Sequence, residues 1–93
     1  MKNKHFNFFC KISGRVKGVG FRAWTKKNAK KYFLTGWVKN CEDKTVECEL
    51  SGSKKNFTLF LKDCLRGPIL SSVKDIKTHE KPFERFKSFT IYY

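Results

Sequence analysis

Between two different hydrophobic patterns, the chain reads Gly14-Arg15-Val16-Lys17-Gly18-Val19-Gly20-Phe21-Arg22. Upstream, over residues 6–12, apolar and polar side chains alternate, which is typical of a strand. Downstream, over residues 21–33, apolar residues recur at helical spacing with lysines between them, which predicts an amphipathic helix with a basic outer face. The glycines permit a sharply bent backbone. We therefore expect a strand, a bent loop and a helix in that order.

Two further strands are expected after this helix. Gly36 precedes a short strand over 37–40, and Asp43-Lys44 forms a tight turn. The strand over 46–50 is clearer, because three apolar side chains on one face alternate with two glutamates on the other.

A second helix and a final strand region complete the predicted elements. An apolar helical face runs over 57–65, between an N-cap at Ser53 and a stop at Gly67-Pro68. Residues 72–78 form a weak strand, since their apolar residues do not alternate cleanly, and residues 86–93 form a better one.

These elements predict an α+β fold. Two apolar helix faces and several one-sided strands are covered most economically by an antiparallel sheet with both helices on one face. Right-handed crossovers then give a ferredoxin-like α/β sandwich (βαββαβ) with four to five strands, as a single domain over 1–93. The expected interior consists of Phe8, Cys10, Ile12, Ala29, Tyr32, Val46, Cys48, Leu50, Phe57, Phe60, Leu61 and Ile91.

Composition and charge narrow the function classes. The chain has 93 residues, of which 40% are hydrophobic, and this argues for one packed core and against disorder. The net charge of +13 favours an anionic partner: nucleic acid, membrane lipid or a small phosphorylated substrate. No apolar run approaches the roughly 20 residues of a membrane span. Residues 1–5 contain no apolar segment typical of a signal peptide, so we expect a cytoplasmic protein.

The cysteines are not spaced like metal ligands. No pair among Cys10, Cys41, Cys48 and Cys64 has the C-x-x-C pattern, and the two histidines do not complete a zinc motif. We expect no metal and no cofactor. All of these cysteines except Cys41 fall on apolar faces, which predicts small core residues.

The residues alone suggest an anion-binding site at the glycine loop. It precedes a helix N-terminus, where about four backbone N–H groups have no intrahelical partner and attract anions. Arg22, in the first helical turn, can contact two phosphate oxygens at once. Taken alone, such a loop could equally be a plain connection between two elements. Asn40, taken alone, could be a residue that only ends a strand.

Two motifs together resemble the acylphosphatase family. The first pattern, G-x-V-x-G-V-x-F-R, is supplied by Gly14, Val16, Gly18, Val19, Phe21 and Arg22, and the second, G-W-V-x-N, by Gly36, Trp37, Val38 and Asn40. The resemblance continues through Asp43, Val46-Glu47, Gly52 and Gly67-Pro68.

The resemblance implies a metal-independent hydrolase of acyl phosphates that works without a cofactor. Arg22 and the loop would hold the phosphoryl group, and Asn40 would position the attacking water. The phosphate-binding residues implied are Val16, Lys17, Gly18, Val19, Gly20, Phe21 and Arg22. The implied partners are a small acyl phosphate and, as product-like ligands, inorganic phosphate or sulfate. We expect a monomer that binds neither membrane nor nucleic acid.

Four positions depart from the family pattern. Lys17 replaces a Gln and adds charge beside the loop. Phe33 replaces a Gly that often ends the first helix, so we expect this helix to end by a different geometry. Lys44 replaces a Gly and leaves the hairpin type open. Cys41 follows Asn40 directly, and exposure near the cationic loop would lower its pKa and allow oxidation to block the site.

Three alternatives remain open. Residues 17–24 partly fit the RNP1 pattern of RNA-binding RRM domains, although RNP1 lies on a strand and here the pattern is helical. A non-catalytic phosphate-binding module on the same fold is the second. The third is a fragment of a larger carbamoyl-transfer maturation protein, which we rank lowest because the sequence has no zinc-finger cysteines.

Overall fold

The computed structural model describes residues 5–93 and contains five strands and two helices. In chain order these are β1 (Phe6–Arg15), α1 (Phe21–Lys31), β2 (Thr35–Asn40), β3 (Val46–Gly52), α2 (Lys54–Arg66), β4 (Ser72–Lys81) and β5 (Phe89–Tyr92). Residues 1–4, which carry most of the segment used to argue against a signal peptide, lie outside this description. No helix among the described residues is long and apolar enough to cross a membrane.

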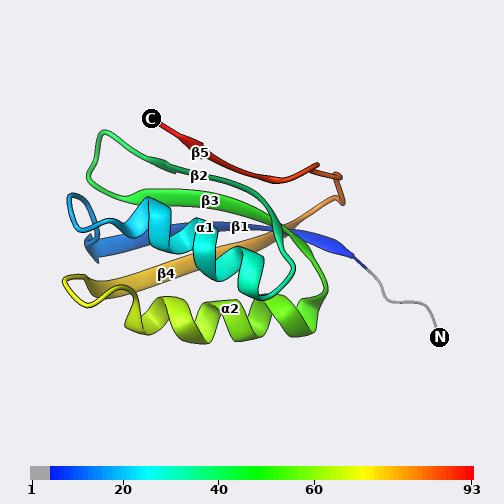
Figure 1. Ribbon diagram of the computed structural model, residues 1–93, viewed down its shortest axis with the longest axis horizontal. Coiled ribbons are helices and arrows are strands. Elements are labelled where there is room, and N and C mark those ends of the chain that lie inside the picture. The colour runs from blue at the N-terminus through cyan, green and yellow to red at the C-terminus, as the bar shows by residue number, and fades with distance from the viewer. Residues whose placement is uncertain (1–4) are drawn as a thin grey trace.

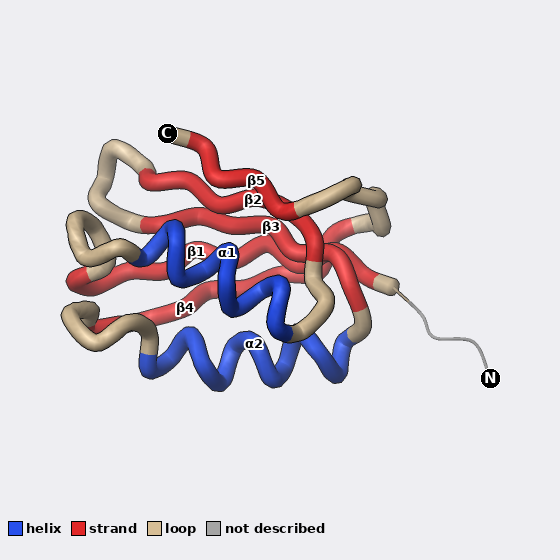
Figure 2. Tube along the Cα trace, in the orientation of Figure 1, coloured by secondary structure: helices blue, strands red, loops and turns tan. Residues whose placement is uncertain are grey.

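The predicted two-layer sandwich is confirmed. The strands form one sheet in the order β4-β1-β3-β2-β5, and both helices lie on the same side of it (Figures 1 and 2). The first four strands pair antiparallel, whereas β5 lies parallel to β2 at the edge of the sheet. This parallel edge brings the ends of β2 and β5 to the same side of the molecule.

Strand register explains where the core lies. In β1 and β3, Cys10 lies opposite Cys48 and Ile12 opposite Val46, and all four are fully buried under the helices. From α2, Phe57 stacks on Phe8 with ring centroids 4.0 Å apart. Burial of such apolar surface is the main favourable contribution to folding.

Most of the predicted interior is buried, and the core is larger than predicted. Three predicted members, Tyr32, Leu61 and Ile91, lie only partly buried at its border. The core also contains Val16, Phe21, Leu34, Val38, Cys64 and Phe89. Burial of Cys10, Cys48 and Cys64 agrees with their predicted role as core residues, and burial also raises the pKa of the Cys64 thiol.

Polar side chains are buried on the opposite face of the sheet. Asn7 is 0% and Glu49 3% exposed. Asn7 Nδ2 donates a 2.9 Å hydrogen bond to Glu49 Oε2, and Lys81 Nζ lies 3.0 Å from Glu49 Oε1. The connection from β4 to β5 covers this group, since the Glu84 N–H donates to Asn7 Oδ1 at 3.1 Å. Both buried side chains on this face, Asn7 and Glu49, therefore have polar partners.

Candidate active site

Four segment ends meet at one end of the sheet. β1 ends at Arg15 and leads into the loop 16–20, α1 begins at Phe21, and β2 ends at Asn40. Because β5 is parallel to β2, its end at Tyr92 lies at this side as well. Figure 1 shows the loop between β1 and α1 and the ends of β2 and β5 toward the left of the view.

The loop presents backbone donors that the fold leaves free. Gly18 and Gly20 both have φ of +75°, a conformation that costs other L-residues about 1–2 kcal/mol. Within the described chain 5–93, none of the N–H groups of residues 17–23 donates a hydrogen bond to another backbone group; Trp24 is the first that does, to the Gly20 oxygen at 3.0 Å. Such a run of unpartnered donors at a helix N-terminus can bind an anion.

A cavity of about 170 Å³ lies against this loop. Its lining combines both predicted motifs and the end of β5: Val16, Gly18, Gly20, Phe21, Arg22, Ala23, Asn40, Ile91 and Tyr93. The volume is below the roughly 300–1,000 Å³ of sites for drug-sized ligands, which suits a small polar group. The structure thus brings Arg22 and Asn40 together at one cavity, although 18 positions separate them in the sequence.

Two predicted phosphate-binding residues do not line this cavity. The Lys17 side chain is exposed. Val19 packs partly buried against the core, and Val16 is 1% exposed although it lines the cavity. These valine side chains therefore anchor the loop through apolar contacts, while Lys17 adds a positive charge at the exposed side of the loop.

Arg22 is held by the C-terminal residues. Its Nη1 donates a 2.9 Å hydrogen bond to the Tyr92 main-chain oxygen, and its guanidinium carbon lies 4.6 Å from the centre of the Tyr93 ring. One Nη1–H group is used in this contact, and the guanidinium has four more N–H donors for a phosphoryl group.

Asn40 has an unpartnered acceptor at the same cavity. The residue ends β2 on the helix-facing side, two positions after the core residue Val38. Its Oδ1 is buried, and no described residue donates a hydrogen bond to it. A buried polar atom without a partner is costly, so a water or ligand donor at this oxygen would be stabilised.

Three lining residues were missed by the sequence analysis. Ala23 follows Arg22 in the first turn of α1, and Ile91 and Tyr93 come from the end of the chain. The position of Ile91 and Tyr93 depends on the parallel pairing of β5 with β2, which local residue patterns do not encode.

The proposed redox sensitivity of Cys41 is not supported. Burial raises the pKa of its thiol above the ordinary value, with smaller effects from neighbouring groups including Glu47. Cys41 also does not line the cavity. A raised pKa leaves less of the reactive thiolate at neutral pH.

The RNP1 interpretation is not supported either. Residues 17–20 form a turn and residues 21–24 the start of α1, so none of this segment lies on a strand. Stacking aromatics of the RRM type would require a strand at this position.

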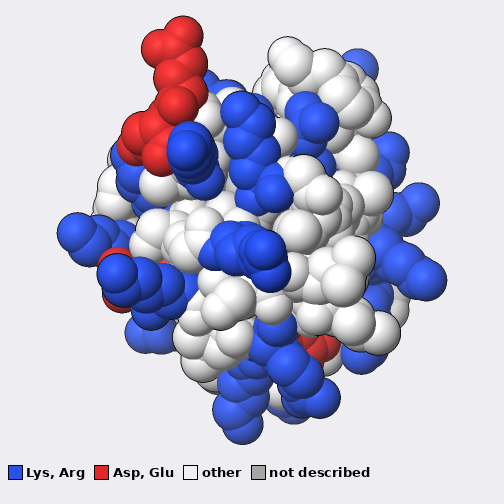
Figure 3. All heavy atoms as spheres, turned by 90° about the vertical axis from the view of Figure 1, so that its left-hand side faces the viewer, with Lys and Arg blue, Asp and Glu red and all other residues white. Residues whose placement is uncertain are grey.

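Basic side chains surround this end of the molecule. Figure 3 views it with lysine and arginine in blue, and acidic atoms are few apart from one protrusion at the upper edge. No cluster of three or more His, Cys, Asp or Glu residues suited to a metal ion occurs in the described part of the chain. The site therefore offers backbone N–H groups, a guanidinium and a carboxamide as its reactive groups.

Comparison with known proteins gives a consistent result. The acylphosphatase family model matches residues 8–91. Proteins named acylphosphatase from Bacillus licheniformis and Clostridium acetobutylicum are each 42% identical, over 88% and 92% of this chain and 92% and 96% of their own lengths. The crystal structure of acylphosphatase from Bacillus subtilis matches with a TM-score of 0.92 at 35% identity, covering 95% of this chain and 99% of that one.

Proposed function

The chain belongs to the acylphosphatase family, and from this premise we propose that it hydrolyses acyl phosphates to a carboxylate and inorganic phosphate. The observation that carries the proposal is the shared cavity, where the unpartnered Asn40 Oδ1 and the Arg22 guanidinium lie beside the loop with free N–H groups.

The phosphoryl group binds in the loop. The N–H groups of residues 17–22 and the free donors of Arg22 contact its oxygens and stabilise the charge that they carry in the transition state. The loop is held in place before substrate arrives, because Val16 is buried and α1 continues directly from it. Preorganised donors of this kind need little rearrangement during the reaction.

Asn40 orients the nucleophile. A water molecule that donates a hydrogen bond to Asn40 Oδ1 is held with its oxygen free to attack phosphorus. The new P–O bond forms to the water oxygen, while the bond from phosphorus to the acyl oxygen breaks and the carboxylate leaves with that electron pair. The water proton passes to a phosphoryl oxygen, so the reaction uses no separate base. A carboxylate is already a good leaving group, and no acid is needed to protonate it.

The proposal also covers the product-like ligands, the oligomeric state and the compartment of the protein. Inorganic phosphate and sulfate bind in the loop as product-like ligands. The protein works as a metal-independent monomer in the cytoplasm. The four free cysteines agree with this compartment, because thiols stay reduced there.

The test is an assay with benzoyl phosphate, with and without EDTA. We expect turnover that EDTA leaves unchanged, competitive inhibition by inorganic phosphate, and little hydrolysis of para-nitrophenyl phosphate, a phosphomonoester with a poorer leaving group. Saturable binding of phosphate without turnover of benzoyl phosphate would instead identify a non-catalytic phosphate-binding module.

A further inference from the structure

A second, larger cavity lies between the two helices. It measures about 580 Å³ and shares no lining residue with the first. From α1 it is lined by Trp24, Lys27, Asn28 and Lys31, and from α2 by Asp63 and Arg66. The four α1 residues follow the i, i+3, i+4, i+7 spacing that places side chains on one helix face. The volume lies within the range of small-molecule sites.

The walls of this cavity are basic. Helix α1 has five basic residues and no acidic one, and α2 has four basic residues and one acidic one. That acidic residue, Asp63, already has two polar partners. Tyr32 Oη donates a 2.8 Å hydrogen bond to its Oδ2, and Lys31 Nζ lies 3.6 Å from the same oxygen. Within residues 5–93, Lys27 and Arg66 form no ion pair. Two cations without a counter-charge at one cavity favour an anion there.

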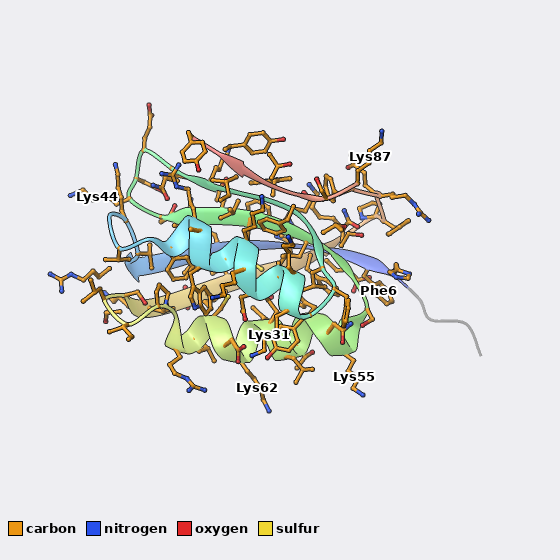
Figure 4. All side chains as sticks on the ribbon, in the orientation of Figure 1. Phe6, Lys31, Lys44, Lys55, Lys62 and Lys87 are labelled. Carbon is orange, nitrogen blue, oxygen red and sulfur yellow. The ribbon has the colours of Figure 1, made fainter. Side chains whose placement is uncertain are left out.

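The lysines around α1 and α2 point in different directions (Figure 4). Lys31 lies between α1 and α2, whereas Lys55 and Lys62 extend away from α2 on its outer side. Lys62 does not line the cavity and points away from it, so it provides a control from the same helix as Arg66.

Asn28 is a buried polar residue where the packing calls for an apolar one. It belongs to the buried stripe of α1 with Phe21, Thr25 and Ala29, and only 6% of it is exposed. No described residue accepts a hydrogen bond from its Nδ2. A buried donor without a partner destabilises the fold, and an apolar residue would avoid that cost. An acceptor atom from a ligand would satisfy it.

Trp24 adds a flat apolar surface to the same cavity. Its indole packs on the buried Phe21 ring, with centroids 5.5 Å apart, and the residue remains partly exposed. A tryptophan supported from behind and open in front can stack on a planar ring.

We propose that the cavity between α1 and α2 binds a nucleoside polyphosphate. Lys27 and Arg66 contact its phosphate oxygens, the base stacks on Trp24, and Asn28 donates to an acceptor of the ligand. Arginine suits phosphate oxygens because its guanidinium donates two parallel hydrogen bonds. This site shares no lining residue with the cavity at Arg22. The proposal of nucleotide binding and the proposal of acyl phosphate hydrolysis can therefore be refuted separately.

Titration with ATP tests the proposal. Trp37→Phe removes the other tryptophan, which lies on the opposite face of the sheet, so that fluorescence reports on Trp24 alone. We expect saturable quenching by ATP with one site per chain, in the presence of EDTA, and the same affinity in an Arg22→Gln background. We expect weaker binding of tripolyphosphate, which has no base, and of adenosine, which has no phosphate. Equal affinity for tripolyphosphate and ATP would overturn the role of Trp24.

Variants locate the bound ligand. Lys27→Gln and Arg66→Gln should each weaken ATP binding about tenfold, equivalent to about 1.4 kcal/mol, whereas Lys62→Gln should change it less than twofold. Asn28→Leu should weaken binding and raise the melting temperature. None of these changes should alter benzoyl phosphate turnover. The proposal is overturned if ATP does not bind, if Arg22→Gln abolishes binding, or if Lys62→Gln weakens binding as much as Lys27→Gln.

Discussion

The Nη1 group of Arg22 donates a hydrogen bond to the Tyr92 main-chain oxygen at 2.9 Å. The contact joins the first turn of α1 to the last strand, although the two residues are 70 positions apart. It fixes one end of a long, flexible side chain without using up its donors. The position of the guanidinium in the cavity therefore depends on the edge strand β5.

The Tyr93 ring should help to position Arg22. Its ring lies 4.6 Å from the guanidinium carbon, and exposed cation–π contacts contribute about 0.5–1 kcal/mol. We expect Tyr93→Ala to raise KM for benzoyl phosphate about two- to fivefold with little change in kcat. Steady-state kinetics measures both constants. Tyr93→Phe keeps the ring and should match the wild type, and a raised KM in that variant would mean that the hydroxyl group acts instead.

Arg22 itself should be required for turnover. Removing one preorganised donor typically costs about 10²–10³ in rate, so we expect Arg22→Ala to lower kcat/KM for benzoyl phosphate by at least this factor. Arg22→Lys keeps the charge but not the fork of donors, and it should fall between Arg22→Ala and the wild type. Circular dichroism should show an unchanged fold. Near-normal hydrolysis by Arg22→Ala would refute the assignment.

Asn40 should be dispensable for stability and necessary for catalysis. Because its buried Oδ1 has no partner among the described residues, Asn40→Ala removes an unsatisfied acceptor and should not lower the free energy of unfolding through a lost hydrogen bond. We expect kcat to fall about 10²–10³-fold in the same variant. Lys39→Ala, at the neighbouring position on the other face of β2, provides the control and should retain kcat. A strongly destabilised Asn40→Ala with normal kcat would make Asn40 a structural residue.

The boundaries of α2 and most of the core could be predicted because they depend on local residue patterns. The clearest case is α2, which begins after Ser53 as predicted: the Ser53 side chain accepts a hydrogen bond from the Asn56 N–H at 3.1 Å. At the other end Gly67 follows the last helical residue. Both motifs act over a few residues, so one sequence is enough to identify them.

Contacts set by topology could not be predicted in the same way. Tyr93 lines the candidate site only because β5 pairs parallel with β2. The alternation over residues 6–12 and 46–50 places Asn7 and Glu49 on the face away from the apolar core residues, but the contact that covers Asn7 comes from the connection between β4 and β5. Neither effect leaves a periodic pattern in the residues that it buries.

The β2–β3 turn should make stability depend on pH in the acid range. Hydrogen bonds from Thr45, together with Lys11, lower the pKa of Asp43 from 3.8 to about 2, and Lys11 Nζ lies 3.0 Å from its Oδ2. The unfolded chain therefore binds more protons between these two pKa values. The contribution of Asp43 is complete above pH 3.8 and is lost as the pH falls through about 2.

Asp43→Asn tests this dependence. Urea unfolding between pH 2 and pH 5 should show a smaller rise of the unfolding free energy with pH in the variant than in the wild type. The contact is exposed to solvent, so high salt should also reduce the difference. Parallel curves for the two proteins would show that other carboxylates account for the acid sensitivity.

The end of α1 offers a gain in stability. We expected Phe33 to end this helix by a different geometry, and this was wrong: Phe33 has φ of +58°, the left-handed conformation that usually belongs to glycine. The Leu34 N–H bonds to the Ala29 oxygen and the Phe33 N–H to the Lys30 oxygen, which is the Schellman motif. Phe33 is 85% exposed, so its ring contributes little packing. Phe33→Gly should therefore raise the unfolding free energy by about 0.5–1 kcal/mol in urea titrations, the relief of strain less the entropy of glycine. Phe33→Ala removes the ring but keeps the strain, and equal stabilisation by both variants would attribute the gain to loss of the ring.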